Sequence, residues 1–427
     1  MGKLPLEGVR VLGMTVILAG PYSEMFLADY GAEVIRVESI QHFAPGTRGQ
    51  YVWPPKGAPG YPNDDPGERP WNRHATFNSM ARNKLAMTVD ITKPEGMEIF
   101  KRLVRVSDVF ISNYVPDVLD RLGITHEMLK AEKPDIIWAK ISGYGDTGPY
   151  RDYRAQANGI DAIAGQASTR GYRDMDPSSG LPGASAADPA MGIAAVFAIV
   201  SALNYRDRTG KGQLIDMALS EQFITYNPQP FMDYAMNGRV QGTLGNRDPI
   251  AVPSGNFRCQ GNDNWVSISV YNDEQWEGFC KVVAEEWVRD PLFKDALSRR
   301  KHEDELEKLV ESWTKRHDYY EVMHRLQKVG VPAGPLLDEA AVFQDPQVKA
   351  REYLVEEYQE DTGTYLYPGA IAKLRNAPLT IRRPPVRLGE DNEYVYKEVL
   401  GISEPEYQRL TETGHIGTAY APGVRAR

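Results

Sequence analysis

The sequence has few cysteines and no excess of positive charge. Only Cys259 and Cys280 occur among 427 residues, which is too few for a disulfide framework or a cysteine-based zinc site. Such sparse cysteine is typical of a reducing compartment, so we expect a cytoplasmic protein. The formal net charge is −9, whereas nucleic-acid-binding domains usually carry a basic surplus. We therefore expect no nucleic-acid partner.

The common nucleotide and nucleophile motifs are missing as well. Gly13 follows the first apolar run, but the next glycine is Gly20, so the G-x-G-x-x-G fingerprint of dinucleotide-binding folds is absent. No P-loop, G-x-S-x-G elbow or cysteine–histidine signature occurs. The seven histidines are scattered without metal-ligand spacing. We predict no metal site and no permanently bound cofactor.

Long hydrophobic runs are scarce. The first six residues have no apolar signal core. The longest apolar run, residues 190–205, is shorter than a membrane span requires, and Asp188 and Arg206 flank it closely. We expect a buried core helix at this position and no membrane partner.

The first forty residues do contain a clear strand–helix–strand pattern. Residues 9–14 and 34–37 are short apolar runs typical of buried strands, and residues 21–30 between them predict a helix that Gly31 ends. This βαβ arrangement implies a parallel sheet. The sequence therefore predicts an α/β fold, with a large doubly wound, Rossmann-like domain over residues 1–208.

The second half of the chain has a different pattern. Residues 265–270 alternate between apolar and polar side chains, which predicts a half-exposed antiparallel strand. Asp318 and Glu321 form a helix-capping pair. At 427 residues, the chain is too long for one ordinary core. We predict a linker at 209–225, a small α+β domain at 226–330, and a linker with a C-terminal part at 331–427. The stretch 331–335 is linker, and the C-terminal part returns to the large domain.

Two carboxylates are the candidate reactive groups. Asp188 follows the small residues 183–187 and precedes Pro189, which suits the first position of a helix. Asp161 also follows a small-residue segment at a predicted helix start. Each carboxylate is either a plain helix N-cap or a reactive group kept ionised by the helix dipole. Five basic residues are candidate phosphate contacts, although each is individually more typical of a solvated surface charge: Arg36, Arg48, Arg82, Lys84 and Arg121.

Seven segments, in order and at family spacing, resemble the class III CoA-transferases, which include formyl-CoA transferase, carnitine CoA-transferase and α-methylacyl-CoA racemase. The segments are Pro5–Leu12, Leu18–Pro21, Gly31–Glu38, Leu119–Gly123, Ser142–Pro149, Thr209–Gln213 and Gly330–Pro335. The resemblance runs nearly end to end. It implies acyl-CoA and small carboxylic acids as substrates and an interlaced dimer. We expect a homodimer, or a heteromer with a paralogous subunit.

The same resemblance assigns roles to residues. It makes Asp188 the nucleophile, which forms an aspartyl anhydride and then an aspartyl-CoA thioester, with Asp161 as a possible supporting group. It also implies a set of CoA contacts: Val16, Ile17, Leu18, Ala19, Val89, Asn113, Tyr114, Arg121 and Leu122. A CoA-contacting arginine of formyl-CoA transferase is Ser39 here, and the stretch 243–250 lacks the glycines of that enzyme's lid, so oxalate or formate is not implied.

Two other functions remain open. The racemases of this family carry a histidine immediately before the aspartate that matches Asp161, and this chain has Ile160 instead. Racemisation needs a base on each face of the α-carbon, so this substitution argues against an acyl-CoA racemase or epimerase. A non-catalytic subunit that only binds CoA is the other alternative, and the presence of Asp188 argues against it.

Overall fold

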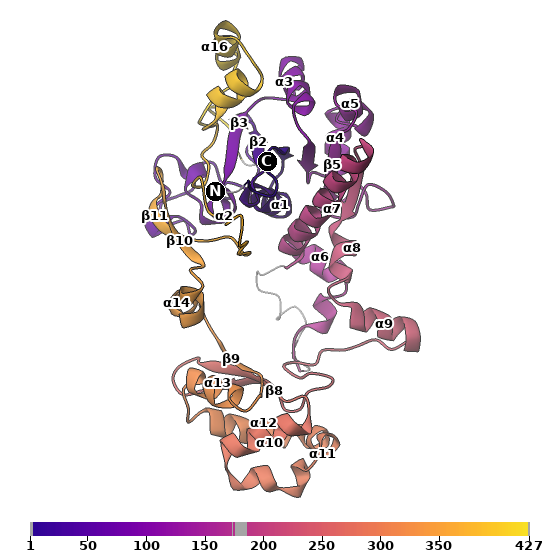
Figure 1. The fold of residues 1–427 in the computed structure, drawn as a ribbon, viewed down its shortest axis with the longest axis vertical. Helices are drawn as coiled ribbons and strands as arrows, with labels where there is room; N and C mark the ends of the chain where they lie inside the picture. The colour runs from indigo at the N-terminus through magenta and orange to yellow at the C-terminus, as the bar shows by residue number, and fades with distance from the viewer. Residues whose placement is uncertain (1–2, 173, 176–185, 426–427) are drawn as a thin grey trace. The chain divides into compact units, whose positions relative to one another are not determined.

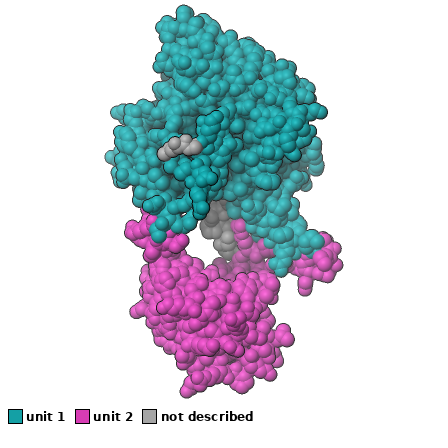
Figure 2. Space-filling model, viewed as in Figure 1, with its two compact units in different colours: residues 1–166, 183–232, 350–427 teal, residues 167–182, 233–349 magenta. Residues whose placement is uncertain are grey.

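The computed structural model describes residues 3–172, 174–175 and 186–425. Two compact units are present, coloured separately in Figure 2, and each has its own hydrophobic core. Unit 1 comprises Met1–Gln166, Gly183–Met232 and Ala350–Arg427, and unit 2 comprises Ala167–Pro182 and Asp233–Lys349. The division into domains at residues 208, 225 and 330 stays a prediction.

Unit 1 is built on a parallel sheet of six strands (Figure 1). The strands are β1 (Arg10–Met14), β2 (Glu33–Glu38), β3 (Lys84–Thr88), β4 (Val109–Ser112), β5 (Ile137–Ser142) and β6 (Leu214–Ala218). Their order is β3-β2-β1-β4-β5-β6, and all neighbours are parallel, which confirms the predicted α/β fold. The order reverses between β1 and β4, and sheets of this kind bind ligands beyond the carboxyl ends of the strands at that point.

Helices pack on both faces of this sheet. They are α1 (Ala19–Asp29), α2 (Ala75–Met80), α3 (Pro94–Arg105), α4 (Pro116–Arg121), α5 (His126–Glu132), α6 (Ala157–Ile163), α7 (Ala187–Thr209) and α8 (Leu219–Ile224). Successive strand residues point to opposite faces. Leu12 accordingly packs in one core with Phe100 of α3, whereas Val11 packs in the other with Leu27 of α1 and Met191 of α7.

Helix α7 departs from the expected buried helix. It has 23 residues and is longer than the predicted run 190–205. Met191, Ala195 and Ile199 are buried, but Ile193 and Phe197 on its other face are 48% and 76% exposed. By length and composition alone α7 could cross a bilayer, although the core helix of a globular protein passes the same test. The expected buried core helix is therefore buried along one face only, and its other face is exposed among the described residues.

Unit 2 has a three-stranded antiparallel sheet of order β7-β8-β9 with helices around it. Its elements are β7 (Ser254–Arg258), β8 (Trp265–Ser269), β9 (Ala333–Leu336), α10 (Asp273–Val283), α11 (Ala296–Lys301), α12 (Glu303–Thr314), α13 (Tyr319–Gln327) and α14 (Glu339–Gln344). The predicted antiparallel strand at 265–270 is confirmed as β8. The cap of α13 is confirmed too, because Asp318 accepts the N–H groups of Tyr320 and Glu321. The stretch 331–335 was expected to be linker, but it enters edge strand β9.

Helix α9 (Pro228–Asn237) and helix α15 (Pro346–Ala350) lie where the chain passes between the units. The C-terminal part of unit 1 contains the antiparallel pair β10 (Leu354–Gln359) and β11 (Gly363–Pro368), and helix α16 (Glu404–Glu412). A π-helical turn spans Tyr394–Val399, and its Tyr396 hydroxyl donates to the Thr88 carbonyl oxygen at 2.8 Å. This part therefore closes over the end of β3.

Candidate active site

Asp188 lies in the first turn of α7. The helix begins at Ala187, and its N-cap residue, Ala186, makes no side-chain capping hydrogen bond. The N-cap interpretation of Asp188 was therefore wrong, because the helix starts before this residue rather than after it. Residues 183–185 of the preceding small-residue segment lie outside the described residues. Its position in the first turn still exposes the Asp188 carboxylate to the positive end of the helix dipole.

The Asp188 carboxylate is held in a partly buried position. Burial and the nearby charge of Asp161 together raise its pKa from 3.8 to about 6, although a hydrogen bond from the backbone N–H of Ala19 opposes the shift. Asp161 is itself buried, and it lies within α6 rather than at its start, so it is not a cap either. A carboxylate with a pKa near 6 is still ionised at neutral pH, and it is more basic than an ordinary aspartate.

Close packing of α1 on α7 brings Ala19 to Asp188. Gly192 of α7 lies against α1, and a Cβ atom at this position would be 2.9 Å from the Tyr22 ring and 3.1 Å from the Ala19 carbonyl oxygen. The first N–H groups of a helix have no partner within that helix. Ala19 is the first residue of α1, so its N–H is available for Asp188.

Side-chain hydrogen bonds hold the first three residues of the loop between β1 and α1. The Thr15 hydroxyl donates to Glu24 at 2.6 Å. The Asn113 amide bonds both ways with Val16, since its Oδ1 accepts the Val16 N–H at 2.7 Å and its Nδ2 donates to the Val16 carbonyl at 2.8 Å. Ile17 donates its N–H to the Thr47 hydroxyl at 2.8 Å. Ile17 has φ of 61°, which a β-branched residue adopts only when its surroundings impose it.

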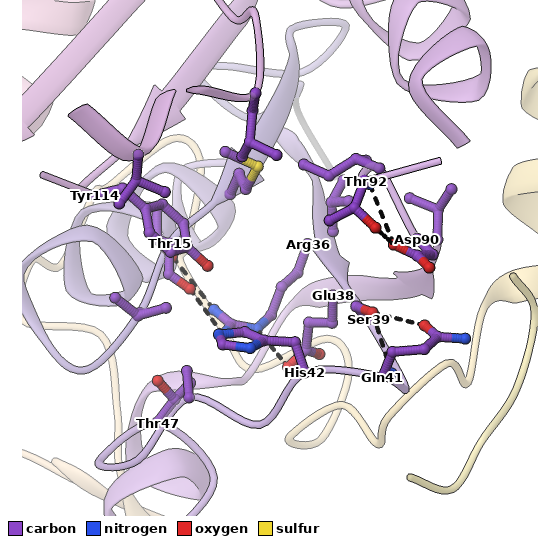
Figure 3. A pocket seen from close by; sticks show the side chains of 18 of the residues that line it. Thr15, Arg36, Glu38, Ser39, Gln41, His42, Thr47, Asp90, Thr92 and Tyr114 are labelled. Carbon is purple, nitrogen blue, oxygen red and sulfur yellow. Dashed lines mark hydrogen bonds and ion pairs between the residues drawn. The ribbon is translucent and has the colours of Figure 1, made fainter. Parts of the chain in front are cut away.

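A cavity of about 500 Å³ opens at the carboxyl ends of strands β1 to β4 (Figure 3). It lies at the switch point of the sheet, as expected for this strand order. Thr15 and Val16 follow β1, Ser39 follows β2, Val89 follows β3 and Tyr114 follows β4. Val16 therefore lies on the cavity wall, while Ala19, three residues later, holds Asp188.

Buried charges stiffen the cavity wall. Figure 3 shows Arg36 between Thr15 and Glu38, and its guanidinium lies 3.3 Å from the Glu38 carboxylate. Arg48 forms two 2.7 Å hydrogen bonds to the same carboxylate. Burial opposes ionisation of Glu38, but these two arginines outweigh it and lower its pKa to about 2. Arg36, Arg48 and Glu38 thus form a buried ionic cluster that supports the loop between β1 and α1.

The structure brings together five of the nine predicted CoA contacts on this cavity: Val16, Val89, Tyr114, Arg121 and Leu122. Ile17, Leu18, Ala19 and Asn113 do not line it. Burial raises the pKa of Tyr114 to about 12, so its hydroxyl stays protonated at neutral pH. The Arg121 side chain is 70% exposed and lies 3.2 Å from Asp117 one helical turn away. Whether these residues contact CoA stays a prediction.

The other four basic candidates were expected to be solvated surface charges, but each is paired with a carboxylate. Arg36 and Lys84 pair with buried Glu24, at 3.6 and 3.0 Å. Arg82 pairs with Asp29 at 2.7 Å, and Arg48 pairs with Glu38. All four side chains are therefore buried in ion pairs within the protein. Arg121 is the one of the five with a largely exposed side chain.

Sequence reasoning missed several cavity residues. Thr47 comes from the segment after β2, and Tyr420 comes from the C-terminal end of the chain. Neither residue stands in a motif, so only the fold reveals them. Within residues 3–172, 174–175 and 186–425, no group of three or more histidine, cysteine, aspartate or glutamate side chains is placed to hold a metal ion.

Comparison with known proteins shows the family. A model described as CoA-transferase family III matches residues 6–392. A succinyl-CoA–D-citramalate CoA-transferase of Chloroflexus aurantiacus is 29% identical, over 95% of this chain and 96% of its own. A formyl-CoA:oxalate CoA-transferase of Rhodopseudomonas palustris is 30% identical, over 96% and 97%. The crystal structure of a CAIB/BAIF family protein from Brucella suis, 31% identical, superposes with a TM-score of 0.78 over 93% of this chain and 100% of its own.

The chain belongs to CoA-transferase family III, as the sequence resemblance had indicated. It is therefore a CoA-transferase, and acyl-CoA thioesters are its substrates. Similar proteins also include an alpha and a beta subunit of a succinyl-CoA–L-malate CoA-transferase, 31% and 30% identical to this chain.

Proposed function

We propose that this enzyme moves CoA from an acyl-CoA donor to a small carboxylic acid through covalent intermediates on Asp188. The observation that carries the proposal is the placement of Asp188. Its carboxylate lies in the first turn of α7 and accepts the N–H of Ala19, and the loop that supplies this N–H also lines the 500 Å³ cavity. A reactive carboxylate and a cavity for the thioester thus share one loop.

The reaction begins when an Asp188 oxygen attacks the thioester carbonyl of the donor. The C–S bond breaks, and an acyl-aspartyl anhydride and CoA thiolate result. The thiolate then attacks the aspartyl carbonyl, which releases the donor acid as a carboxylate and leaves an aspartyl-CoA thioester. The acceptor carboxylate attacks that thioester to give a second anhydride and free thiolate. Attack of the thiolate on the acceptor carbonyl forms the product and regenerates Asp188. Covalent catalysis divides one difficult exchange into easier steps.

The surroundings of Asp188 suit this nucleophilic role. Its pKa of about 6 leaves it ionised at pH 7 yet more basic than an exposed aspartate. Each attack on a carbonyl places negative charge on oxygen, and the positive end of a helix dipole stabilises such charge. Asp188 lies in the first turn of α7, at that end of the helix.

The cavity at the strand ends is the proposed CoA site. Val16, Val89 and Leu122 give it an apolar wall, and the Arg121 guanidinium at its rim is the proposed phosphate contact. An exposed ion pair such as Arg121–Asp117 contributes little to stability, so a phosphate group can compete for the arginine. Ser39 replaces the arginine of formyl-CoA transferase and offers only a hydroxyl, which donates to Gln41 at 2.7 Å.

Racemisation is the second candidate, and the structure offers it no support. Ile160 is completely buried in the core beside α7. It occupies the position where the related racemases place a base, and a buried isoleucine can move no proton. We therefore keep CoA transfer as the proposed activity.

A dimer with interlaced chains is the proposed assembly. Ile193, Phe197 and Val200 form an exposed apolar stripe on α7, spaced by about one helical turn, of the kind that a partner subunit covers. Because two relatives are named as alpha and beta subunits, the partner is either a second copy or a paralogous chain. Sedimentation of the purified chain separates these cases. A monomer at micromolar concentration that gains activity with a paralogue supports the heteromer.

A panel of substrates tests the activity. Succinyl-, acetyl-, formyl- and aryl-CoA donors are each incubated with malate, citramalate, oxalate and monocarboxylic acids, and new CoA esters are measured. The named relatives act on dicarboxylic acids, so these acceptors form the first arm. We expect transfer by the native enzyme and none by Asp188→Asn. Undiminished transfer by Asp188→Asn contradicts the proposal.

A further inference from the structure

We propose that Asn113 is a positioning residue for Asp188, which acts through the loop Val16–Ala19 rather than by contact with CoA. The inference rests on the proposed role of Asp188 as nucleophile. Asn113 follows β4 and Val16 follows β1, so the side chain crosses the point where the sheet reverses its order. A residue at this point can fix one loop against the other.

The hydrogen bonds of Asn113 are directed at the loop. Its Oδ1 accepts the N–H of Val16 at 2.7 Å, and its Nδ2 donates to the carbonyl of the same residue at 2.8 Å. One planar amide thus fixes both polar groups of one backbone residue. Asn113 does not line the cavity, although its neighbour Tyr114 does. Its acceptor oxygen and one of its two N–H groups are therefore already engaged.

The residues after Val16 are also held in place, as far as the start of α1. Ile17 is in the left-handed region, with φ of 61°, and the Thr47 hydroxyl accepts its N–H. Such a conformation is strained for isoleucine and persists only where the surroundings hold it. In the first turn of α1, Gly20 leaves room for Asn113 and Thr15 because it has no side chain. A Cβ atom there would lie 3.1 Å from the Asn113 Cγ and 2.6 Å from Thr15.

The segment Val16–Ala19 ends in a hydrogen bond to the Asp188 carboxylate. Leu18 is the N-cap of α1, and the next N–H, that of Ala19, donates to Asp188. The path from Asn113 to Asp188 therefore consists of two hydrogen bonds to Val16, the residues Val16–Ala19, and one hydrogen bond from Ala19 to Asp188. If Asn113 is removed, the turn relaxes, and the Ala19 N–H loses its fixed direction.

Few charged groups act on Asp188 from the elements packed against α7. Asp161 of α6 is the charged side chain that raises the pKa of Asp188. On β5, Lys140 is paired with Asp146, and on α1, Glu24 is paired with Lys84. Glu221 of α8 lies in the first turn of its own helix, and Asp216 of β6 accepts the Asp146 N–H at 3.0 Å. A change in the Asp188 titration caused by a substitution at neutral Asn113 therefore reports on the hydrogen bond rather than on a lost charge.

The test compares Asn113→Ala with the native enzyme in two measurements. The carboxyl carbon resonance of Asp188, identified as the one missing in Asp188→Asn, is titrated in ¹³C-aspartate-labelled protein without substrate. We expect its pKa to rise by about one pH unit, because a hydrogen bond to the ionised form is weakened. In turnover assays we expect kcat to fall about tenfold or more at neutral pH while the KM for the CoA donor is unchanged.

Two further variants keep the test decisive. Thr47→Val releases Ile17 without altering Asn113 and is expected to shift the Asp188 titration in the same direction. If Asn113→Ala does not fold, an unshifted titration in Thr47→Val overturns the inference, because the loop then does not fix the Ala19 N–H. Val118→Ala alters the cavity wall away from the turn, and we expect it to change KM but not the titration.

A raised KM with an unshifted Asp188 titration in Asn113→Ala would overturn the inference and make Asn113 a CoA contact. A lower melting temperature with titration and kcat unchanged would overturn it in favour of a purely structural role. Failure of the proposed function would give a different result from both of these. Asp188→Asn would then stay fully active, whereas the titration without substrate would still report on Asn113.

Discussion

Asp161 of α6 lies near Asp188 of α7, and its charge adds to the effect of burial in raising the pKa of Asp188 to about 6. Two carboxylates that repel each other in a buried place are unfavourable for folding. In the proposed reaction, the same burial and repulsion that cost stability also make the Asp188 carboxylate more basic.

This relationship predicts that Asp188→Asn stabilises the protein at high pH. The folded-state pKa of about 6 lies above the ordinary 3.8, so the folded form binds more protons and wild-type stability falls as pH rises through that window. Asparagine carries no charge and can still accept the Ala19 N–H. We expect a gain on the order of 3 kcal/mol at pH 8, which disappears below pH 4.

Urea unfolding at both pH values measures this effect. Asp135→Asn is the matched control, because Lys133 lowers the pKa of Asp135 and the sign is reversed. A less stable Asp188→Asn at pH 8 would contradict the account. So would a gain of equal size at pH 4.

The close approach of α1 and α7 predicts an effect of Gly192→Ala. The added methyl group meets the Tyr22 ring at 2.9 Å and the Ala19 carbonyl oxygen at 3.1 Å, so the helices must separate. We expect a loss of about 1–3 kcal/mol in the free energy of unfolding, together with lower kcat. Gly159→Ala in α6 is the control, because nothing lies within 4 Å of its added Cβ. Equal stability of the two variants would show that the contact does not matter.

Replacement of Arg121 by alanine should weaken binding of the CoA donor without destabilising the fold. Its side chain is 70% exposed, and its ion pair with Asp117 is of the kind worth less than about 1 kcal/mol. We expect KM for the donor to rise about tenfold with little change in kcat or melting temperature. Arg102→Ala removes a partly exposed arginine that pairs with Glu406 and does not line the cavity, so it serves as control. A lower melting temperature of Arg121→Ala with unchanged KM would assign Arg121 a structural role.

The burial of Ile160 predicts that the enzyme does not exchange the α-proton of a 2-methylacyl-CoA. Incubation in D₂O followed by mass spectrometry measures the exchange. We expect no deuterium uptake above that of an enzyme-free sample. Uptake at the rate of turnover would replace the transferase proposal with a racemase.

Much of the fold could be predicted because its strands are short apolar runs that alternate with helices along the chain. Within the predicted strands 9–14 and 34–37, residues 11–14 and 34–37 are buried, so composition alone indicated strands. The strand at 333–336 was missed because Pro332 and Pro335 predict a break. It is an edge strand, where a missing backbone N–H is tolerated.

The site was only partly predictable. Resemblance to the family pointed to Asp188. The exposed face of α7 was not predicted, because apolar residues such as Phe197 occur on every side of this helix, so no polar side marks the exposed surface. Thr47 and Tyr420 reach the cavity from distant segments and carry no local signal. The restraint by Asn113 likewise depends on two loops that meet only in the folded sheet.

Chemical trapping of Asp188 tests the central claim most directly. The enzyme is incubated with an acyl-CoA donor alone and then treated with hydroxylamine or borohydride, and its peptides are analysed by mass spectrometry. The account predicts a hydroxamate or an alcohol at Asp188, dependent on the donor and absent from Asp188→Asn. Modification of Asp161 instead, or transfer without any modified aspartate, would contradict it.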